Sequence, residues 1–219
     1  MKKTQLNPRF CLLAMATCLI WGCGTGVKKE TPAASDKLYA AFEASQSPRD
    51  TLHFFLPENP SGRPVSDSLL KICLDSTQFE FLHFQTGDPH FWADKKYPLS
   101  DDVEACLLHT NEFWFKKQTL LLYHKTKRTF FSAIEVASFY GGDGGQIAVE
   151  SWLFHTNGTP HLYVKNAEHW VTIKEEQEAP TEQVSETGNL LRWEAPAFKP
   201  RSTPDSTRLL QNFRMHHQW

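Results

Sequence analysis

The chain has no apolar run long enough to cross a membrane. Its longest uncharged apolar stretch, residues 10–21, has twelve residues, whereas a spanning helix needs about 20. This stretch follows the basic residues Lys2, Lys3 and Arg9 and precedes small residues. A basic end, a short apolar core and small residues at the cleavage site are typical of a secretory signal peptide. We therefore expect residues 1–22 to be a signal peptide.

The chain also lacks clustered positive charge. Without Lys2, Lys3 and Arg9, the 23 Lys and Arg residues fall to 20, against 25 Asp and Glu, so the net charge is near −5. Nucleic acids and anionic lipid surfaces are bound by clustered Lys and Arg side chains. We therefore expect no nucleic-acid partner and no electrostatic attachment to a membrane.

Cysteine is scarce beyond the signal peptide, where only Cys23, Cys73 and Cys106 occur. An exported protein meets an oxidising compartment, which permits a disulfide between Cys73 and Cys106. Two buried free thiols are the alternative, because a free cysteine packs as a small apolar residue. The sequence leaves both alternatives open.

Residues 19–23, Leu-Ile-Trp-Gly-Cys, resemble the lipobox of bacterial lipoproteins. Cleavage before Cys23 uses the whole apolar run, whereas a cut after Ala16 leaves an apolar core of only four residues. Trp21 stands where the family usually has a small residue. The resemblance implies that the Cys23 sulfur carries a diacylglycerol and that the new amino terminus carries a third acyl chain. Two or more acyl chains anchor a protein stably to a bilayer.

The residues after Cys23 predict a location and a tether. Gly24 stands where the family's inner-membrane retention signal has aspartate, so the resemblance implies an outer-membrane protein that faces the periplasm or the outside. Residues 24–34 are small and polar and include Pro32. We expect residues 23–35 to be the lipidated cysteine and a flexible tether.

Residues 36–219 are expected to form a single globular domain, because their length and the 40% hydrophobic content of the whole chain supply a sizeable core. Capping residues and apolar spacing predict three short helices. The first starts at Ser35 or Asp36 and ends before Pro48, and the others cover residues 66–74 and 100–108. The proline-rich residues 57–64 are expected to form a loop.

Aromatic and β-branched residues dominate from Phe79 onward and predict strands. The runs are residues 79–84, 112–115, 120–123, 130–140, 147–155 and 161–170, and a last apolar piece covers residues 190–193. The segments between them are too short for crossover helices, so we expect antiparallel pairing. Residues 174–188 carry almost no apolar side chain and are expected to form a solvated loop. The predicted fold class is α+β, a mainly antiparallel β-sheet with short N-terminal helices.

The strongest local signal is Asn157-Gly158, because Asn-Gly readily takes the two positive φ angles of a type I′ hairpin turn. With Thr156 opposite Thr159, the register continues until Glu150 stands opposite Lys165. Leu153 and Leu162 then share one face with other core residues. The opposite face carries large aromatic rings together with Glu150 and Lys165.

Two interpretations of that aromatic face remain open. It can be a half-covered sheet face on which a helix or the C-terminal segment lies. It can also be a platform on which a sugar or a peptide stacks, because Trp and Tyr combine flat apolar area with a polar edge. The residues of this possible ligand platform are Trp152, Phe154, His161 and Tyr163.

The histidines do not predict a metal site. His155 and His161 point to opposite faces of the predicted hairpin, so they cannot bind one ion together. His216 and His217 are expected to lie on an exposed tail. The glycine-rich residues 141–145 join two strands and contain only one acidic residue, which is too few for a calcium loop. We predict no metal and no other cofactor.

No catalytic residues are predicted either. The chain has no Gly-x-Ser-x-Gly motif. A carboxylate pair for glycoside cleavage could come from Glu80, Glu104, Asp143 and Glu150, but the spacing selects no two of them. The favoured hypothesis is a lipid-anchored, non-enzymatic binding or assembly module of the cell envelope, with an envelope protein or a glycan as its partner. A membrane-tethered hydrolase acting on glycan or peptide is the alternative.

Overall fold

The computed structural model of the chain describes residues 30–45, 51–84, 87–142, 144–172, 180–202 and 206–217. The predicted signal peptide, Cys23 and Asp143 lie outside these residues. Among the helices that the structure describes, none has both the length and the apolar character needed to span a bilayer.

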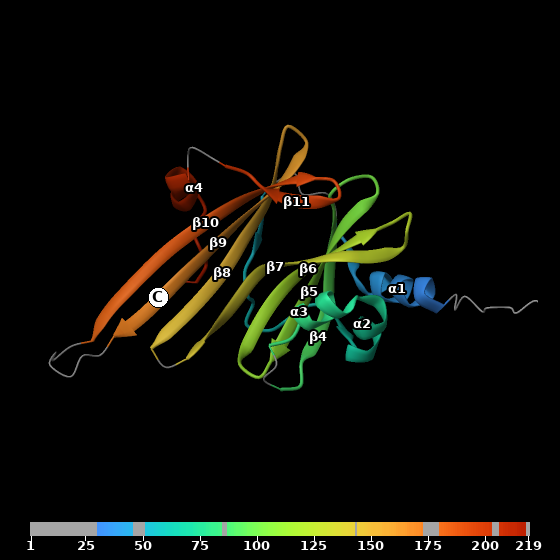
Figure 1. Cartoon of the computed structure of the whole chain (residues 1–219), viewed down its shortest axis with the longest axis horizontal. Coiled ribbons are helices and arrows are strands. Elements are labelled where there is room, and N and C mark those ends of the chain that lie inside the picture. Colours follow the sequence, from blue (N-terminus) through green and yellow to red (C-terminus); the bar gives the residue numbers. More distant parts are fainter. Residues whose placement is uncertain are drawn as a thin grey trace, which may run out of the picture.

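Eleven strands form one large sheet within the described residues (Figure 1). The predicted β-rich domain with a mainly antiparallel sheet is confirmed, and one parallel pair, β1 with β4, makes the sheet mixed. β2 pairs with β8, and β3 pairs with β4. The sheet order is β1 (Glu43–Ala44), β4 (His90–Pro98), β5 (Val103–Glu112), β6 (Phe115–His124), β7 (Thr129–Gly142), β8 (Gly145–Thr156), β9 (Thr159–Thr172), β10 (Thr181–Glu194) and β11 (Ala197–Pro200), with β2 (Leu52–Phe54) and β3 (Arg63–Val65) off this path.

The helices of the described chain are α1 (Glu30–Ala41), α2 (Asp67–Cys73), α3 (Ser76–Phe81) and α4 (Ser206–Asn212). The prediction of α2 is confirmed, and the Ser66 side chain caps it by accepting a hydrogen bond from the Leu69 N–H group. α1 begins at Glu30, so residues 30–35, which the sequence assigned to the tether, are helical. Pro32 lies in the first turn, where its missing N–H group removes no helical hydrogen bond.

Several predicted segments are wrong, and two of them have the wrong type of regular structure. Residues 103–108, predicted as part of a helix, belong to strand β5, which is buried on both faces. A strand of this kind has no alternation of polar residues, so its pattern does not differ from that of a buried helix. Residues 79–81, predicted as part of a strand, belong to α3. The missed signal is the capping box of Asp75 and Gln78, whose side chains each bond to the other residue's backbone N–H group.

Residues 181–188, predicted as part of a loop, form the first half of β10. This half is exposed apart from the half-buried Gly188, and its backbone pairs with β9 from Thr181 opposite Thr172 onward. A strand that is held by backbone hydrogen bonds and buries no side chains has no hydrophobic alternation, so the sequence did not predict it. Arg63 and Pro64, predicted to lie in a loop, belong to β3.

The Asn157-Gly158 hairpin is confirmed. Asn157 has a φ of 51° and Gly158 a φ of 76°, and the predicted register holds from Thr156 opposite Thr159 to Glu150 opposite Lys165. Side chains that follow one another along β8 or along β9 therefore pack in different hydrophobic clusters. Leu153 and Leu162 pack in the interior of the curved sheet, whereas Trp152 and Tyr163 pack on its other side.

The sheet has covering helices at two separate places. α1, α2 and α3 cover one face of β4–β6 through an apolar cluster that includes Leu38, Leu70 and Leu121. Figure 1 shows α4 at the opposite end of the molecule from α1 and α2, beside β10. Residues 206–217, which include α4, are called the C-terminal segment below.

Candidate functional site

The aromatic face of β8 and β9 lies under the C-terminal segment. Trp152 is 5% exposed and Tyr163 is 1% exposed. The Phe213 ring covers both, with ring centroids 5.2 Å from Trp152 and 5.0 Å from Tyr163, and it stacks on Phe154 at 5.5 Å. His161 is buried beside Phe154. The structure therefore brings the four residues of the possible ligand platform together, but as a face covered by this segment.

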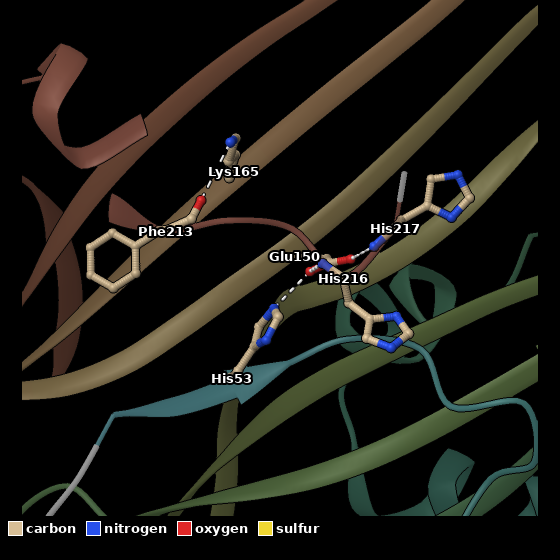
Figure 2. Close-up of polar contacts among 6 residues, drawn as sticks. All are labelled: His53, Glu150, Lys165, Phe213, His216 and His217. Carbon is tan, nitrogen blue, oxygen red and sulfur yellow. Dashed lines mark hydrogen bonds and ion pairs between the residues drawn. The ribbon is translucent and has the colours of Figure 1, made fainter. Parts of the chain in front are cut away.

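A buried carboxylate holds the end of the C-terminal segment (Figure 2). Glu150 accepts backbone hydrogen bonds from His216 at 2.7 Å and from His217 at 2.8 Å. Its Oε2 atom also lies 2.6 Å from Nε2 of His53, whose ring stacks on Trp152. Burial by itself raises the pKa of the Glu150 carboxyl, but these three hydrogen bonds outweigh burial and hold the pKa below its ordinary value. Glu150 is therefore ionised at neutral pH.

A buried ammonium group holds the other part of the same segment. Lys165 is 3% exposed, and its Nζ atom donates to the backbone carbonyl groups of Leu210 at 3.2 Å and Phe213 at 3.3 Å. Figure 2 shows the bond to Phe213. Nζ also lies 2.9 Å from Oε2 of Glu186 on β10. The two charges thus bind opposite kinds of main-chain group, N–H at Glu150 and C=O at Lys165.

A pocket of about 390 Å³ opens between the end of the C-terminal segment, the chain that follows β2, and strands β6, β7 and β8. Its walls combine apolar side chains with Glu58, Lys116, Glu150 and the two histidines of the segment. The rings of His216 and Phe55 stack at 4.5 Å, and Lys116 donates to the Glu58 carbonyl group at 3.0 Å. These contacts join the chain that follows β2 to the C-terminal segment and to β6. We call it the Trp114 pocket; its lining residues are Leu56, Pro57, Glu58, Trp114, Lys116, Ser138, Phe139, Ala148, Val149, Glu150, His216 and His217.

Trp114 belongs to an unusual turn between β5 and β6. Glu112 pairs with Phe115, so Phe113 and Trp114 are the two turn residues. Phe113 has a φ of 60°, a conformation that bulky residues rarely adopt, and is 73% exposed. Trp114 is 65% exposed. The turn therefore presents two large rings to solvent, of which Trp114 lines the pocket.

The Trp114 pocket is suited to holding a molecule. An exposed indole and buried apolar walls can contact the flat faces of a ligand, while Glu58 and the histidines can form hydrogen bonds. Glu150 already accepts three hydrogen bonds and is ionised, so it stabilises the pocket wall and has no proton to donate.

The remaining predicted sites are placed as follows. Cys73 and Cys106 are buried free thiols in the core under the N-terminal helices, which is the second of the two alternatives for this pair. Cys23 lies outside the described residues. The described part of the chain contains no group of three or more His, Cys, Asp or Glu residues that could hold a metal ion.

Two residues of this site were missed in the sequence. His53 lies on a three-residue strand that pairs with β8, and it is 97 positions from Glu150. No local pattern predicts such a contact. Trp114 was assigned to a strand, although its place between the paired residues Glu112 and Phe115 makes it a turn residue.

No known protein family, no curated protein and no solved structure matches this chain.

Proposed function

We propose that the protein is a lipid-anchored binding module of the bacterial cell envelope, and that its Trp114 pocket holds a glycan. The observation that carries this proposal is the exposed Trp114 ring at a pocket of about 390 Å³. An indole offers a flat apolar face to a sugar ring, and sugar hydroxyl groups need polar partners around it. Glu58, His216 and His217 supply such partners.

The anchor in this proposal is the sulfur of Cys23. The sequence support is the lipobox-like Leu-Ile-Trp-Gly-Cys at residues 19–23. Acyl chains at Cys23 would keep the domain at the membrane surface without any need for basic residues. In this proposal the domain is held at the outer membrane and meets its glycan in the periplasm or at the cell surface.

The geometry favours binding over hydrolysis. Glycoside cleavage uses one carboxyl group that donates a proton and a second carboxylate across the bond. In the Trp114 pocket, Glu150 is buried, ionised and already bonded to His53, His216 and His217. Glu58, the other carboxylate that lines the pocket, is exposed to solvent.

The test is calorimetric titration of the mature protein with soluble peptidoglycan fragments and with lipopolysaccharide core oligosaccharide. Trp114→Ala is expected to weaken binding by about tenfold, which is the effect of one aromatic stacking contact. Trp170→Ala is the matched control, because Trp170 is also an exposed tryptophan but does not line the pocket. The proposal fails if neither glycan binds, or if both variants weaken binding equally. Shortened glycan products would favour the hydrolase instead.

A further inference from the structure

A second pocket lies against β2 and the chain that follows it, where Pro57 lines both this pocket and the Trp114 pocket. Its volume is about 320 Å³, which is in the range of small-molecule sites. The wall from β2 and the chain after it includes Phe54, and apolar side chains of β4 and β5 face the same space, among them Tyr97 and Leu107. The polar residues that line this pocket are His53, Ser61, Asp94, Lys95, His109 and Gln118.

Four of these polar residues form one chain of contacts. Ser61 Oγ donates to Asp94 Oδ2 at 2.9 Å, and Nε2 of His109 lies 3.2 Å from the same oxygen. Nδ1 of His109 lies 3.4 Å from Nε2 of Gln118, its cross-strand partner. The hydrogen bond from His109 is the main cause that holds the pKa of Asp94 below its ordinary value. Asp94 is therefore an anion that fixes the orientation of the imidazole ring.

This chain of contacts leaves one atom without a partner. With its proton on Nε2, the His109 ring donates to Asp94 and accepts at Nδ1 from the amide N–H of Gln118. The other end of that amide, Oε1 of Gln118, is buried and has no hydrogen-bond partner among the described residues. A buried acceptor without a partner is costly, and Gln118 lines the pocket.

The backbone next to this cluster has two irregular features, a register shift in β4 and a close approach at Gly62. The register of β4 against β5 shifts between Ala93 and Lys96, so Asp94 lies in a β-bulge. Gly62 has a φ of 104°, and a Cβ atom at this position would lie 2.2 Å from the Ala93 carbonyl oxygen. This close approach brings Ser61 onto Asp94. Bulges commonly re-aim side chains next to binding sites.

We propose that this pocket is a second binding site, separate from the Trp114 pocket, for a small molecule that carries an O–H or N–H donor on an apolar ring. The donor bonds to Oε1 of Gln118, and the ring lies against Phe54, Tyr97 and Leu107. Asp94 and His109 act as positioning residues, because they hold the Gln118 amide with its oxygen free.

The test uses three probes of similar size: benzyl alcohol, benzylamine and anisole, of which only the first two can donate a hydrogen bond. Each is titrated into isotopically labelled mature protein, and the side-chain amide signals of Gln118 are followed by NMR. The two donors are expected to bind about fivefold more tightly than anisole, the effect of one hydrogen bond. A preference for benzylamine over benzyl alcohol identifies a cationic ligand, and the reverse identifies a hydroxyl compound.

The matched variant is Gln118→Met, which keeps the volume but removes the acceptor. It is expected to bind all three probes equally weakly, whereas Trp114→Ala is expected to bind them as the unaltered protein does. The proposal is overturned if anisole binds as tightly as the donors, if Gln118→Met keeps the preference, or if the Gln118 signals do not shift at millimolar probe. The titration of the unaltered protein decides the matter if the variant does not fold. A failure here leaves the glycan proposal intact, because the two pockets are tested by different variants.

Discussion

Glu150 and Lys165 stand directly opposite one another on β8 and β9, and both side chains bond to the backbone of the C-terminal segment. Each charge is buried, so its hydrogen bonds replace those that water would make. Glu150 binds two N–H groups and Lys165 binds two C=O groups. The segment is therefore held by polar contacts at two places and by the Phe213 ring between them.

The first prediction concerns the charge of Glu150. Glu150→Gln is expected to lower the free energy of unfolding by about 2–3 kcal/mol at pH 7, because it removes hydrogen bonds to a charged group. The measurement is guanidinium unfolding. Glu194→Gln, a change at an exposed glutamate of β10, is the control and is expected to have little effect.

The pH dependence of the Glu150 effect has a definite sign. The pKa of the carboxyl is lower in the folded state than its ordinary value of 4.5. Its contribution to stability is therefore complete well above pH 4.5 and is lost as the pH falls through the lowered pKa. The difference between Glu150→Gln and the unaltered protein should shrink over this acidic range. An equal difference at pH 7 and below pH 4 would contradict the ionised state of Glu150.

The second prediction concerns the ring that covers the aromatic face. Phe213→Ala is expected to lower the free energy of unfolding by about 2 kcal/mol. Truncation of a buried Phe to Ala usually costs about 3–5 kcal/mol, and the Phe213 ring is only half-buried. The chain has seven tryptophans, so the emission of Trp152 is taken as the difference between spectra recorded with and without Trp152→Phe. In Phe213→Ala this difference spectrum should lie at longer wavelength, because water reaches the Trp152 indole. Arg214→Ala, at the exposed neighbouring position, is the control. An unchanged difference spectrum in Phe213→Ala would show that another group covers Trp152.

The third prediction concerns the two core thiols. Burial raises the pKa of both Cys73 and Cys106, so the reactive thiolate is scarce and shielded. In the native folded protein, neither thiol is expected to react with iodoacetamide at pH 8. Both are expected to react in guanidinium without a reductant, and mass spectrometry counts the modified sites. A requirement for reductant would establish a disulfide, and a third modified site would show that Cys23 carries no lipid.

The fourth prediction concerns Gly62 at the second pocket. Gly62→Ala is expected to lower the free energy of unfolding by more than about 1 kcal/mol. A residue with a side chain is strained at positive φ, and its Cβ atom would meet the Ala93 carbonyl group. Gly87→Ala is the matched control, since a Cβ there would meet nothing within 4 Å. Thermal unfolding of both variants is the measurement. Equal melting temperatures would mean that the loop can move away from Ala93 without loss.

Part of the fold follows from local sequence alone. Ser66 predicts the start of α2, and Asn157-Gly158 predicts the β8–β9 register down to the Glu150–Lys165 pair. Each of these features depends on a few neighbouring residues. The start of α2 depends on a side chain that caps backbone N–H groups, and the β8–β9 register depends on turn residues that adopt positive φ angles. The capping box at Asp75 would have predicted α3 in the same way.

The sites were decided by contacts between distant parts of the chain. His53 reaches Glu150 because β2 pairs with β8, and the aromatic face is covered because residues 206–217 fold back over it. The sequence determined which side chains of β8 share a face, since alternation along a strand is a local property. Only the tertiary structure decided what covers that face and where pockets remain, because burial depends on packing between segments far apart in sequence.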